Sequence, residues 1–389
     1  MDRRSFLLGA SGLAVSQMLI GCNSKKQTQL NVQLLKGSIP AQIVNQFRKS
    51  LQSEANLKFV PINQIQDIFK QLQNWQKPET KDQAGWKKYI PLIQNQKQSP
   101  ADLVTLGDYW LKAAIEQKLI QPLETEKIIQ KWSSLNPRWQ QLVKRDDQGN
   151  IDPAGKVWAA PYGWGSTVIV YNREKFQKFD WRPKDWSDLW REELRDRISL
   201  LNHHREVIGL VLKKLGQSYN TENITQIPAL KSELLALHQQ VKFYDSTTYL
   251  EPLITGDTWL AVGWSNDVIP ILSRYPKLTA VIPESGTAIW ADLWVSPTGV
   301  EQNTLASDWI NFCWQPNIAK QIVLLTKTNS PMLTNLAAAD VPEPLQNLLI
   351  NNQEFFNKSE FLLPLSRLEN KRYQYLFNTI KNTNTDDKT

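Results

Sequence analysis

The chain has 389 residues and a net charge of +7, with 45 lysines and arginines against 38 aspartates and glutamates. These charges are interspersed, so no basic block marks a nucleic-acid surface, and two cysteines exclude a disulfide-rich scaffold. The length exceeds what one domain usually holds, so we expect two lobes.

The N-terminus has the pattern of an export signal. Arg3 and Arg4 precede an apolar run from Phe6 to Ile20, which is too short to span a bilayer. Paired arginines are typical of the twin-arginine route, but Asp2 stands where such signals usually carry Ser or Thr, which leaves the general secretory route open. We expect residues 1–21 to be removed.

A lipid-attachment motif follows at the end of the apolar run. Leu19-Ile20-Gly21-Cys22 resembles a bacterial lipobox, in which the thiol of Cys22 is diacylated and becomes the new N-terminus. The alternative is a buried N-terminal helix with an incidental cysteine. The motif predicts an extracytoplasmic lipoprotein with residues 22–29 as a tether, and it leaves Cys313 as a core residue.

The first part of the chain alternates between strand and helix patterns. Period-two runs predict strands at 30–35, 57–61 and 101–106, and helical spacing predicts helices at about 40–55 and 64–75. This order predicts a parallel α/β sheet.

The second part contains further elements of both kinds. Two strand-like runs, 157–161 and 167–171, flank Tyr162-Gly163-Trp164-Gly165 and are candidates to cross between the lobes. Helices are predicted at 202–215, 228–241, 303–314 and 316–327, strands at 258–263 and 278–283, and a disordered polar tail at 382–389.

No catalytic motif stands out in the sequence. It has no G-x-S-x-G, no G-x-x-x-x-G-K-[ST], no G-x-G-x-x-G and no C-x-x-C. His203 and His204 are adjacent and would point apart, and no H-E-x-x-H pattern or carboxylate cluster completes a metal site. We therefore expect no enzyme, no cofactor and no metal.

One segment combines tryptophans with a carboxylate. In an extended conformation its period of two puts Trp290, Asp292 and Trp294 on one face. A protonated amine gains roughly 0.5 to 2 kcal/mol over an indole face, and a charge-assisted hydrogen bond to a carboxylate fixes its position. The segment predicts a site for an organic ammonium; the alternative is a half-buried strand with an exposed aspartate.

The same segment carries a family resemblance. Residues 284–292 look like the E-x-G-x-x-x-W-x-D motif of polyamine-binding proteins in the family of bacterial extracellular solute-binding proteins. Further similar runs follow in the family's order at 161–172, 186–190, 198–220 and 262–267. The resemblance implies two α/β lobes joined by crossing strands, with a ligand cleft between lobe 1 (30–161 plus about 293–333) and lobe 2 (162–292 plus about 334–381).

The resemblance also implies a ligand site formed by Trp290, Asp292, Trp264, Glu206, Tyr109 and Trp164. In it Trp290 and Asp292 would hold an amine, Trp264 would stack on the alkyl chain, and Glu206 would meet the other end. For the aromatic residues the alternative is core packing. For Glu206 it is a solvated carboxylate near a helix N-terminus, paired with Arg205.

Three positions depart from the family pattern. His203 stands where the family often has Asp, Ser330 replaces a tyrosine, and Gly107 replaces a serine. At least one ammonium anchor is therefore missing, and Asp108 and Asp267 are candidates to replace it. The identity of the polyamine is left open.

These expectations combine into one function with two alternatives. The chain is predicted to be a monomeric, lipid-anchored binding component of an ABC importer, which closes on a polyamine and delivers it to a permease. An exported carbohydrate-active hydrolase, with two carboxylates at a defined separation, is one alternative. The other is an envelope scaffold lipoprotein with a degenerate pocket.

Overall fold

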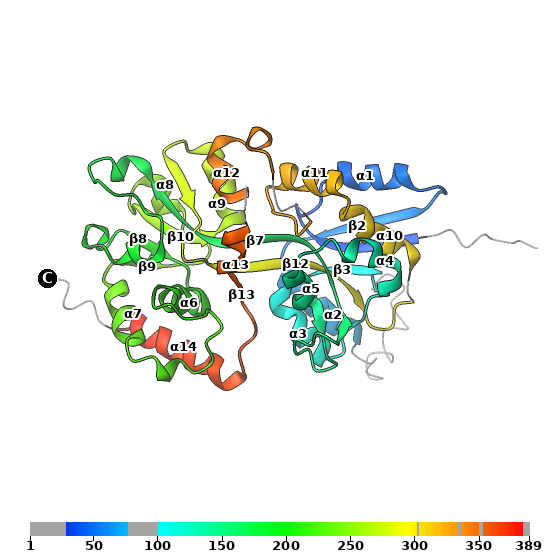
Figure 1. Ribbon diagram of the computed structural model, residues 1–389, viewed down its shortest axis with the longest axis horizontal. Coiled ribbons are helices and arrows are strands. Elements are labelled where there is room, and N and C mark those ends of the chain that lie inside the picture. Colours follow the sequence, from blue (N-terminus) through cyan, green and yellow to red (C-terminus); the bar gives the residue numbers. More distant parts are fainter. Residues whose placement is uncertain (1–28, 77–99, 302, 333–335, 350–352, 384–389) are drawn as a thin grey trace, which may run out of the picture.

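The computed structural model describes residues 29–76, 100–301, 303–332, 336–349 and 353–383. Figure 1 shows two groups of strands and helices on either side of a pair of long central strands. The predictions for Arg3, Arg4, Cys22, the tether up to residue 28 and the tail from residue 384 fall outside the described residues.

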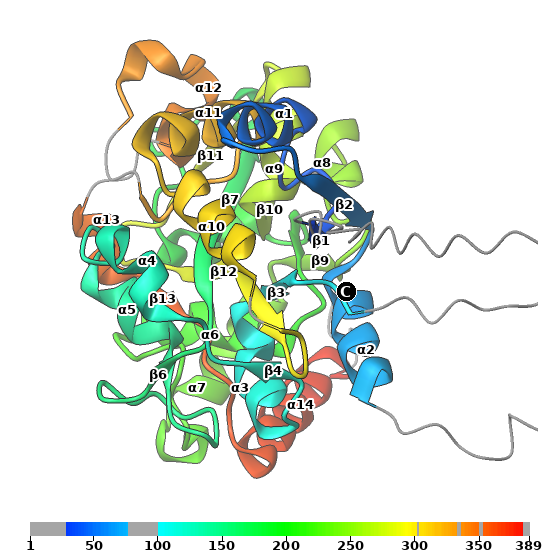
Figure 2. The same ribbon diagram turned by 90° about the vertical axis from the view of Figure 1, so that its right-hand side faces the viewer.

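The first strands and helices confirm the predicted alternation. β1 (Gln29–Leu35), β2 (Asn56–Ile62) and β3 (Leu103–Gly107) are parallel neighbours, with α1 (Ala41–Ser50) and α2 (Ile65–Gln76) between them in the chain. α1 ends earlier than predicted because the chain from residue 56 already pairs with β1 along its full length. Figure 2 shows α1 and α11 on one side of these strands, and α2 and α3 on the other.

Two long antiparallel strands, β7 (Ala160–Asn172) and β12 (Ala288–Pro297), form the centre of the molecule (Figure 1). The prediction of two strands interrupted at residues 162–165 was wrong, because β7 is continuous and buried throughout. Its glycines at positions 163 and 165 pair with Asp292 and Trp290 of β12, whose side chains take the space that the glycines leave.

One mixed sheet runs through both halves in the order β2-β1-β3-β12-β7-β10-β8-β9. Beyond β7 the sheet continues with β10 (Leu260–Trp264), β8 (Ile198–Leu200) and β9 (Val241–Tyr244), and β11 (Leu278–Val281) also pairs with β7. Strand β10 leads into α9 (Ser265–Arg274), and β8 leads into α6 (His204–Lys214). Since β10 and β8 are parallel, both helices begin at the same edge of the sheet.

The remaining elements complete the two halves. The predicted helices near 228–241, 303–314 and 316–327 are confirmed as α7 (Leu230–His238), α10 (Thr304–Cys313) and α11 (Pro316–Thr326). The others are α3 (Asp108–Glu116), β4 (Ile120–Gln121), α4 (Thr125–Trp132), α5 (Pro137–Val143), β5 (Lys144–Arg145), β6 (Lys156–Val157), η3 (Arg173–Phe176), η4 (Trp186–Trp190), η5 (Glu192–Leu194), η6 (Ile224–Gln226), α8 (Glu251–Thr255), η7 (Ala338–Asp340), α12 (Glu343–Leu349), α13 (Gln353–Lys358), β13 (Glu360–Phe361) and α14 (Arg367–Lys381).

The buried apolar side chains form three clusters. The first joins β1, β3, β12 and α10, and includes Trp294, whose ring stacks on Tyr162 at 4.1 Å. Cys313 is buried in this cluster, which confirms its predicted core role. The second and third clusters lie on the β8–β10 side and include Trp186 and Leu253. Among the described residues, no helix is long and apolar enough to cross a membrane.

Candidate ligand-binding site

Two carboxylates meet where β3 ends beside β12. Asp292 of β12 pairs with Gly107, the last residue of β3, and Asp108 begins α3. Asp108 Oδ1 accepts a hydrogen bond of 3.0 Å from the backbone N–H of Ala291. Asp108 is 6% exposed and Asp292 is 7% exposed, so both acids lie side by side with little access to water.

Within the described ranges, this carboxylate pair has no adjacent counter-ion. Burial raises the pKa of Asp108 to about 7, and burial together with the Asp108 charge raises the pKa of Asp292 to about 7. The nearby cation, Arg145, lowers the Asp108 pKa but donates its hydrogen bonds to the carbonyls of Leu142 and Gly149. The Asp292 carboxylate makes no hydrogen bond or ion pair with any residue that the structure describes. An incoming cation would therefore meet two acids whose charge no adjacent cation of the described residues balances.

Trp290 lies beside this pair because β7 carries a glycine opposite it. A Cβ atom on Gly165 would lie 2.1 Å from Cζ2 of Trp290 and 2.7 Å from Oγ of Ser265. Gly163, two residues earlier, faces Asp292 in the same way, with its Cβ position 3.8 Å from Oδ2. Because neither glycine has a side chain, Trp290 and Asp292 pack directly on the backbone of β7. The indole of Trp290 is half-buried.

A second group forms at the start of α6 and α9. Glu206 is 3% exposed and accepts hydrogen bonds from Thr167 Oγ1 at 2.9 Å and from Trp264 Nε1 at 3.0 Å. Burial raises the pKa of Glu206, although both bonds lower it. The carboxylate is therefore neither solvated nor paired with Arg205, whose guanidinium bonds to the carbonyls of Leu363 and Tyr219.

The indole of Trp264 is thus held at its edge by Glu206. Its backbone N–H donates to the Tyr249 hydroxyl at 3.2 Å, and that hydroxyl donates to Asp267 Oδ2 at 3.0 Å. Burial raises the pKa of Asp267. Ser265 follows Trp264 in the chain and lies beside Gly165, so the second group adjoins Trp290.

Trp164 and Tyr109 are the two other aromatic residues expected in the cleft, and the first is buried while the second is exposed. Trp164 is 4% exposed and contacts Trp139, Phe355 and Phe356 in the first cluster, and its place between the two glycines puts it on the opposite face of β7. Tyr109 follows Asp108 and is 42% exposed, with its ring against Trp110. The structure brings together Asp108, Asp292, Trp290, Trp264 and Glu206, but not Trp164.

His203, Ser330 and Gly107, the three positions that depart from the family pattern, supply no carboxylate to the site. Burial, with help from Arg205, lowers the pKa of His203 to about 4, so its imidazole is neutral at pH 7. Its Nδ1 has no hydrogen-bond partner among the described residues. Ser330 is buried and accepts from the N–H of Met332, while a Cβ on Gly107 would lie 3.3 Å from Ile65 Cδ1.

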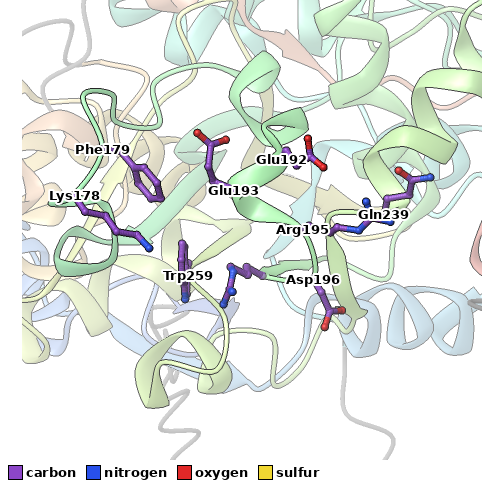
Figure 3. A pocket seen from close by; sticks show the side chains of 9 residues that line it. Lys178, Phe179, Glu192, Glu193, Arg195, Asp196, Gln239 and Trp259 are labelled. Carbon is purple, nitrogen blue, oxygen red and sulfur yellow. The ribbon is translucent and has the colours of Figure 1, made fainter. Parts of the chain in front are cut away.

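Other features of the surface lie apart from this group. A cavity of about 580 Å³ (Figure 3) is lined by Lys178, Phe179, Glu192, Glu193, Arg195, Asp196, Arg197, Gln239 and Trp259. Its charges are mixed, and none of the candidate residues lines it. In the described ranges, no group of three or more His, Cys, Asp or Glu is arranged to hold a metal ion.

Comparisons with known proteins identify the family of the chain. The family described as bacterial extracellular solute-binding protein matches residues 98–359. The spermidine/putrescine-binding periplasmic protein of Escherichia coli K12 is 28% identical over 255 residues, which cover 65% of this chain and 68% of that protein. The putrescine-binding periplasmic protein PotF of the same organism is 26% identical over 260 residues, covering 62% of this chain and 68% of PotF.

Solved structures show the same fold. PotD of Streptococcus pneumoniae, a spermidine/putrescine ABC transporter substrate-binding protein, superimposes with a TM-score of 0.73 at 20% identity, covering 91% of this chain and 99% of that one. The Tp0655 lipoprotein of Treponema pallidum gives 0.66 at 16% identity, covering 90% and 99%. The predicted two-lobed periplasmic-binding-protein fold is confirmed.

Proposed function

Because this chain belongs to the family of bacterial extracellular solute-binding proteins, we propose that it is the substrate-binding component of an ABC importer and takes a polyamine such as putrescine or spermidine. A member of this family binds and delivers a solute, so the chain is not an enzyme. One observation supports the ligand class most: the buried carboxylates of Asp108 and Asp292 have no adjacent counter-ion in the part of the chain that the structure describes, and they lie beside the Trp290 indole.

The proposed mechanism follows from the positions of these groups. One ammonium group of the ligand enters between Asp108 and Asp292, where charge-assisted hydrogen bonds hold it, and Trp290 supplies a cation-π face. The methylene chain packs along Trp290 and toward Trp264. Asp108 follows β3, which pairs with β12, and Trp264 ends β10, which pairs with β7. A ligand that contacts residues from both halves of the sheet favours a closed arrangement of the lobes.

The lobe boundaries are part of this proposal. Lobe 1 comprises residues 30–161 with about 293–333, and lobe 2 comprises 162–292 with about 334–381. The first apolar cluster draws mainly on lobe 1, and the other two draw mainly on lobe 2. The buried exceptions in the first cluster are residues of β7 and β12 next to the boundary, together with Phe356 of α13 and Phe361 of β13.

We also propose that the protein is held at the membrane through a diacylated Cys22 after export by the Arg3-Arg4 signal, acts as a monomer and delivers its ligand to a permease. The similarity to proteins named as periplasmic supports an extracytoplasmic location. Labelled fatty acid should enter the wild-type chain but not Cys22→Ser; equal labelling of both would contradict this anchor.

The proposed function is tested by thermal unfolding with putrescine, spermidine and a panel of amino acids, sugars and anions. A ligand at 1,000 times its dissociation constant adds about 4 kcal/mol to the free energy of unfolding. A shift with the polyamines alone is the expected result. A higher unfolding temperature with another compound instead would keep the importer function and assign it a different ligand. An unchanged unfolding temperature with every compound would contradict the proposal.

Glu206 is proposed to act through Trp264. Glu206→Gln should weaken putrescine binding by less than about tenfold, because the amide oxygen still accepts from Trp264 Nε1 and the amide can donate to Thr167. Glu206→Ala, which removes both bonds, should weaken binding more. Calorimetry of both variants checks this; a loss of about 100-fold in Glu206→Gln would instead make Glu206 a direct charge partner of the ligand.

A further inference from the structure

We propose that Asp108 and Asp292 share one proton in the ligand-free protein, and that a ligand's ammonium group expels this proton when it binds. The inference rests on the proposed amine site and adds a proton exchange to it. Binding then depends on pH even though the ligand's own charge does not change near neutrality.

The geometry favours a shared proton because both acids are buried and face the same space. Asp292 pairs across the sheet with Gly107, and Asp108 follows Gly107 at the first position of α3. Oδ1 of Asp108 is occupied by the N–H of Ala291. Backbone N–H groups of Tyr109 and of Asp108 itself also favour the ionised Asp108 carboxylate, whereas the Asp292 carboxylate receives no hydrogen bond from a described residue. A proton between the acids would supply Asp292 with the donor that it otherwise lacks.

The surrounding groups do not neutralise two charges. Arg145 of β5 favours ionised Asp108, but its guanidinium is buried and hydrogen-bonded to main-chain carbonyls. Tyr162 of β7 is neutral, because burial and the Asp292 charge raise its pKa well above the usual range. Its hydroxyl interacts with Thr105 at 2.9 Å and with Ser38 at 3.2 Å.

The pKa values of the two acids agree with this geometry. Each is raised from 3.8 to about 7, mainly by burial, and for Asp292 also by the charge of Asp108. Two neighbouring buried acids titrate as a pair, so the first proton leaves well before the second. At neutral pH the ligand-free pair therefore holds about one proton between its two carboxylates.

The exchange conserves charge in the site. Before binding, two carboxylates and one proton carry a net charge of −1. When an ammonium group binds, the shared O–H bond breaks, the proton passes to solvent, and N–H donors of the ligand take its place. The site again carries −1, counting the ligand's ammonium. Affinity should therefore rise with pH, by up to about tenfold per pH unit where one full proton is released.

The test is calorimetric titration of the wild-type protein with putrescine at pH 7, in phosphate, imidazole and Tris. A released proton is taken up by the buffer, so the slope of observed enthalpy against buffer ionisation enthalpy counts the protons. We expect about one proton at pH 7 and a smaller value at pH 8, where the ligand is still fully charged and the acid pair holds less than one proton. Putrescine binding with a zero slope between pH 6 and 8 would overturn the inference. Absence of binding at every pH would overturn the amine site itself.

Two variants identify the proton's position. Asp108→Asn keeps an oxygen that can accept from Ala291 but removes one acid, so proton release should fall below about half of the wild-type value. Asp147→Asn is the matched control, because Asp147 is 63% exposed and paired with Lys156 at the surface, and its release should equal that of wild type. Unchanged release in folded Asp108→Asn would overturn the shared site. If that variant does not fold, the wild-type slope decides.

Discussion

Asp292→Asn is expected to weaken putrescine binding by at least about 100-fold, because the variant removes one of the two buried charge partners of the ammonium group. The asparagine side chain has nearly the same shape as the aspartate, so its packing on the backbone of β7 is unchanged. Calorimetry at pH 8 measures the effect, with Asp147→Asn as the control for a surface charge. Binding within threefold of wild type would remove Asp292 from the site.

The same substitution should stabilise the ligand-free protein at alkaline pH. The folded-state pKa of Asp292 is raised from 3.8 to about 7, so the folded state holds the proton more tightly than the unfolded chain. The ligand-free wild-type protein therefore loses stability as pH rises from about 4 to about 7. Removing the charge should add on the order of 2 kcal/mol to the free energy of unfolding at pH 8, and little at pH 4.

Thermal unfolding of ligand-free Asp292→Asn and wild type at both pH values separates two explanations of lost binding. A variant that binds no putrescine but unfolds at a higher temperature at pH 8 has lost a ligand contact. A variant that unfolds at a lower temperature at both pH values would be destabilised for a reason other than the Asp292 charge. The loss of binding would then say nothing about that charge.

Gly165→Ala is expected to damage both stability and binding. The new methyl group would lie 2.1 Å from Cζ2 of Trp290 and 2.7 Å from Oγ of Ser265, so the indole must move. Overpacking of this kind costs about 1 to 3 kcal/mol of stability. Because Trp290 forms one wall of the proposed site, putrescine binding should fall by at least about tenfold.

Gly163→Ala is the matched control for this prediction. It lies two residues away on the same face of β7, but its methyl group would meet Thr328 Cγ2 at 3.2 Å and Asp292 at 3.8 Å, which requires only a small adjustment. It should unfold closer to wild type than Gly165→Ala does. Equal losses of stability in both variants would contradict the close packing of Trp290 on Gly165.

Much of the fold could be predicted because its elements have simple periods. The alternation in 30–35 and 289–294 predicts β1 and β12, and the helical spacing in 64–75 predicts α2. The two glycines of β7 misled the prediction, because glycine usually weakens a strand. Their role depends on the side chains of β12, which lie more than 120 residues away in the chain.

The candidate site could be predicted only in part for the same reason. The period of two placed Trp290 and Asp292 on one face, and β12 has that form. The contact of Asp108 with Ala291 spans 183 residues, and the bond from Trp264 to Glu206 spans 58. Such contacts depend on sheet order and register, which local patterns do not contain. The family resemblance implies that Trp164 lines the cleft, whereas the alternation of the continuous strand β7 places it in the core.

The proposed binding of a polyamine at the acidic pair beside Trp290 is tested by a calorimetric titration of the purified protein with putrescine at pH 8, repeated with Asp292→Asn. We expect one saturable site per chain in the wild type and none over the same concentration range in the variant. Saturable binding that is equal in both proteins, or binding of a sugar or an anion but of no amine, would contradict it.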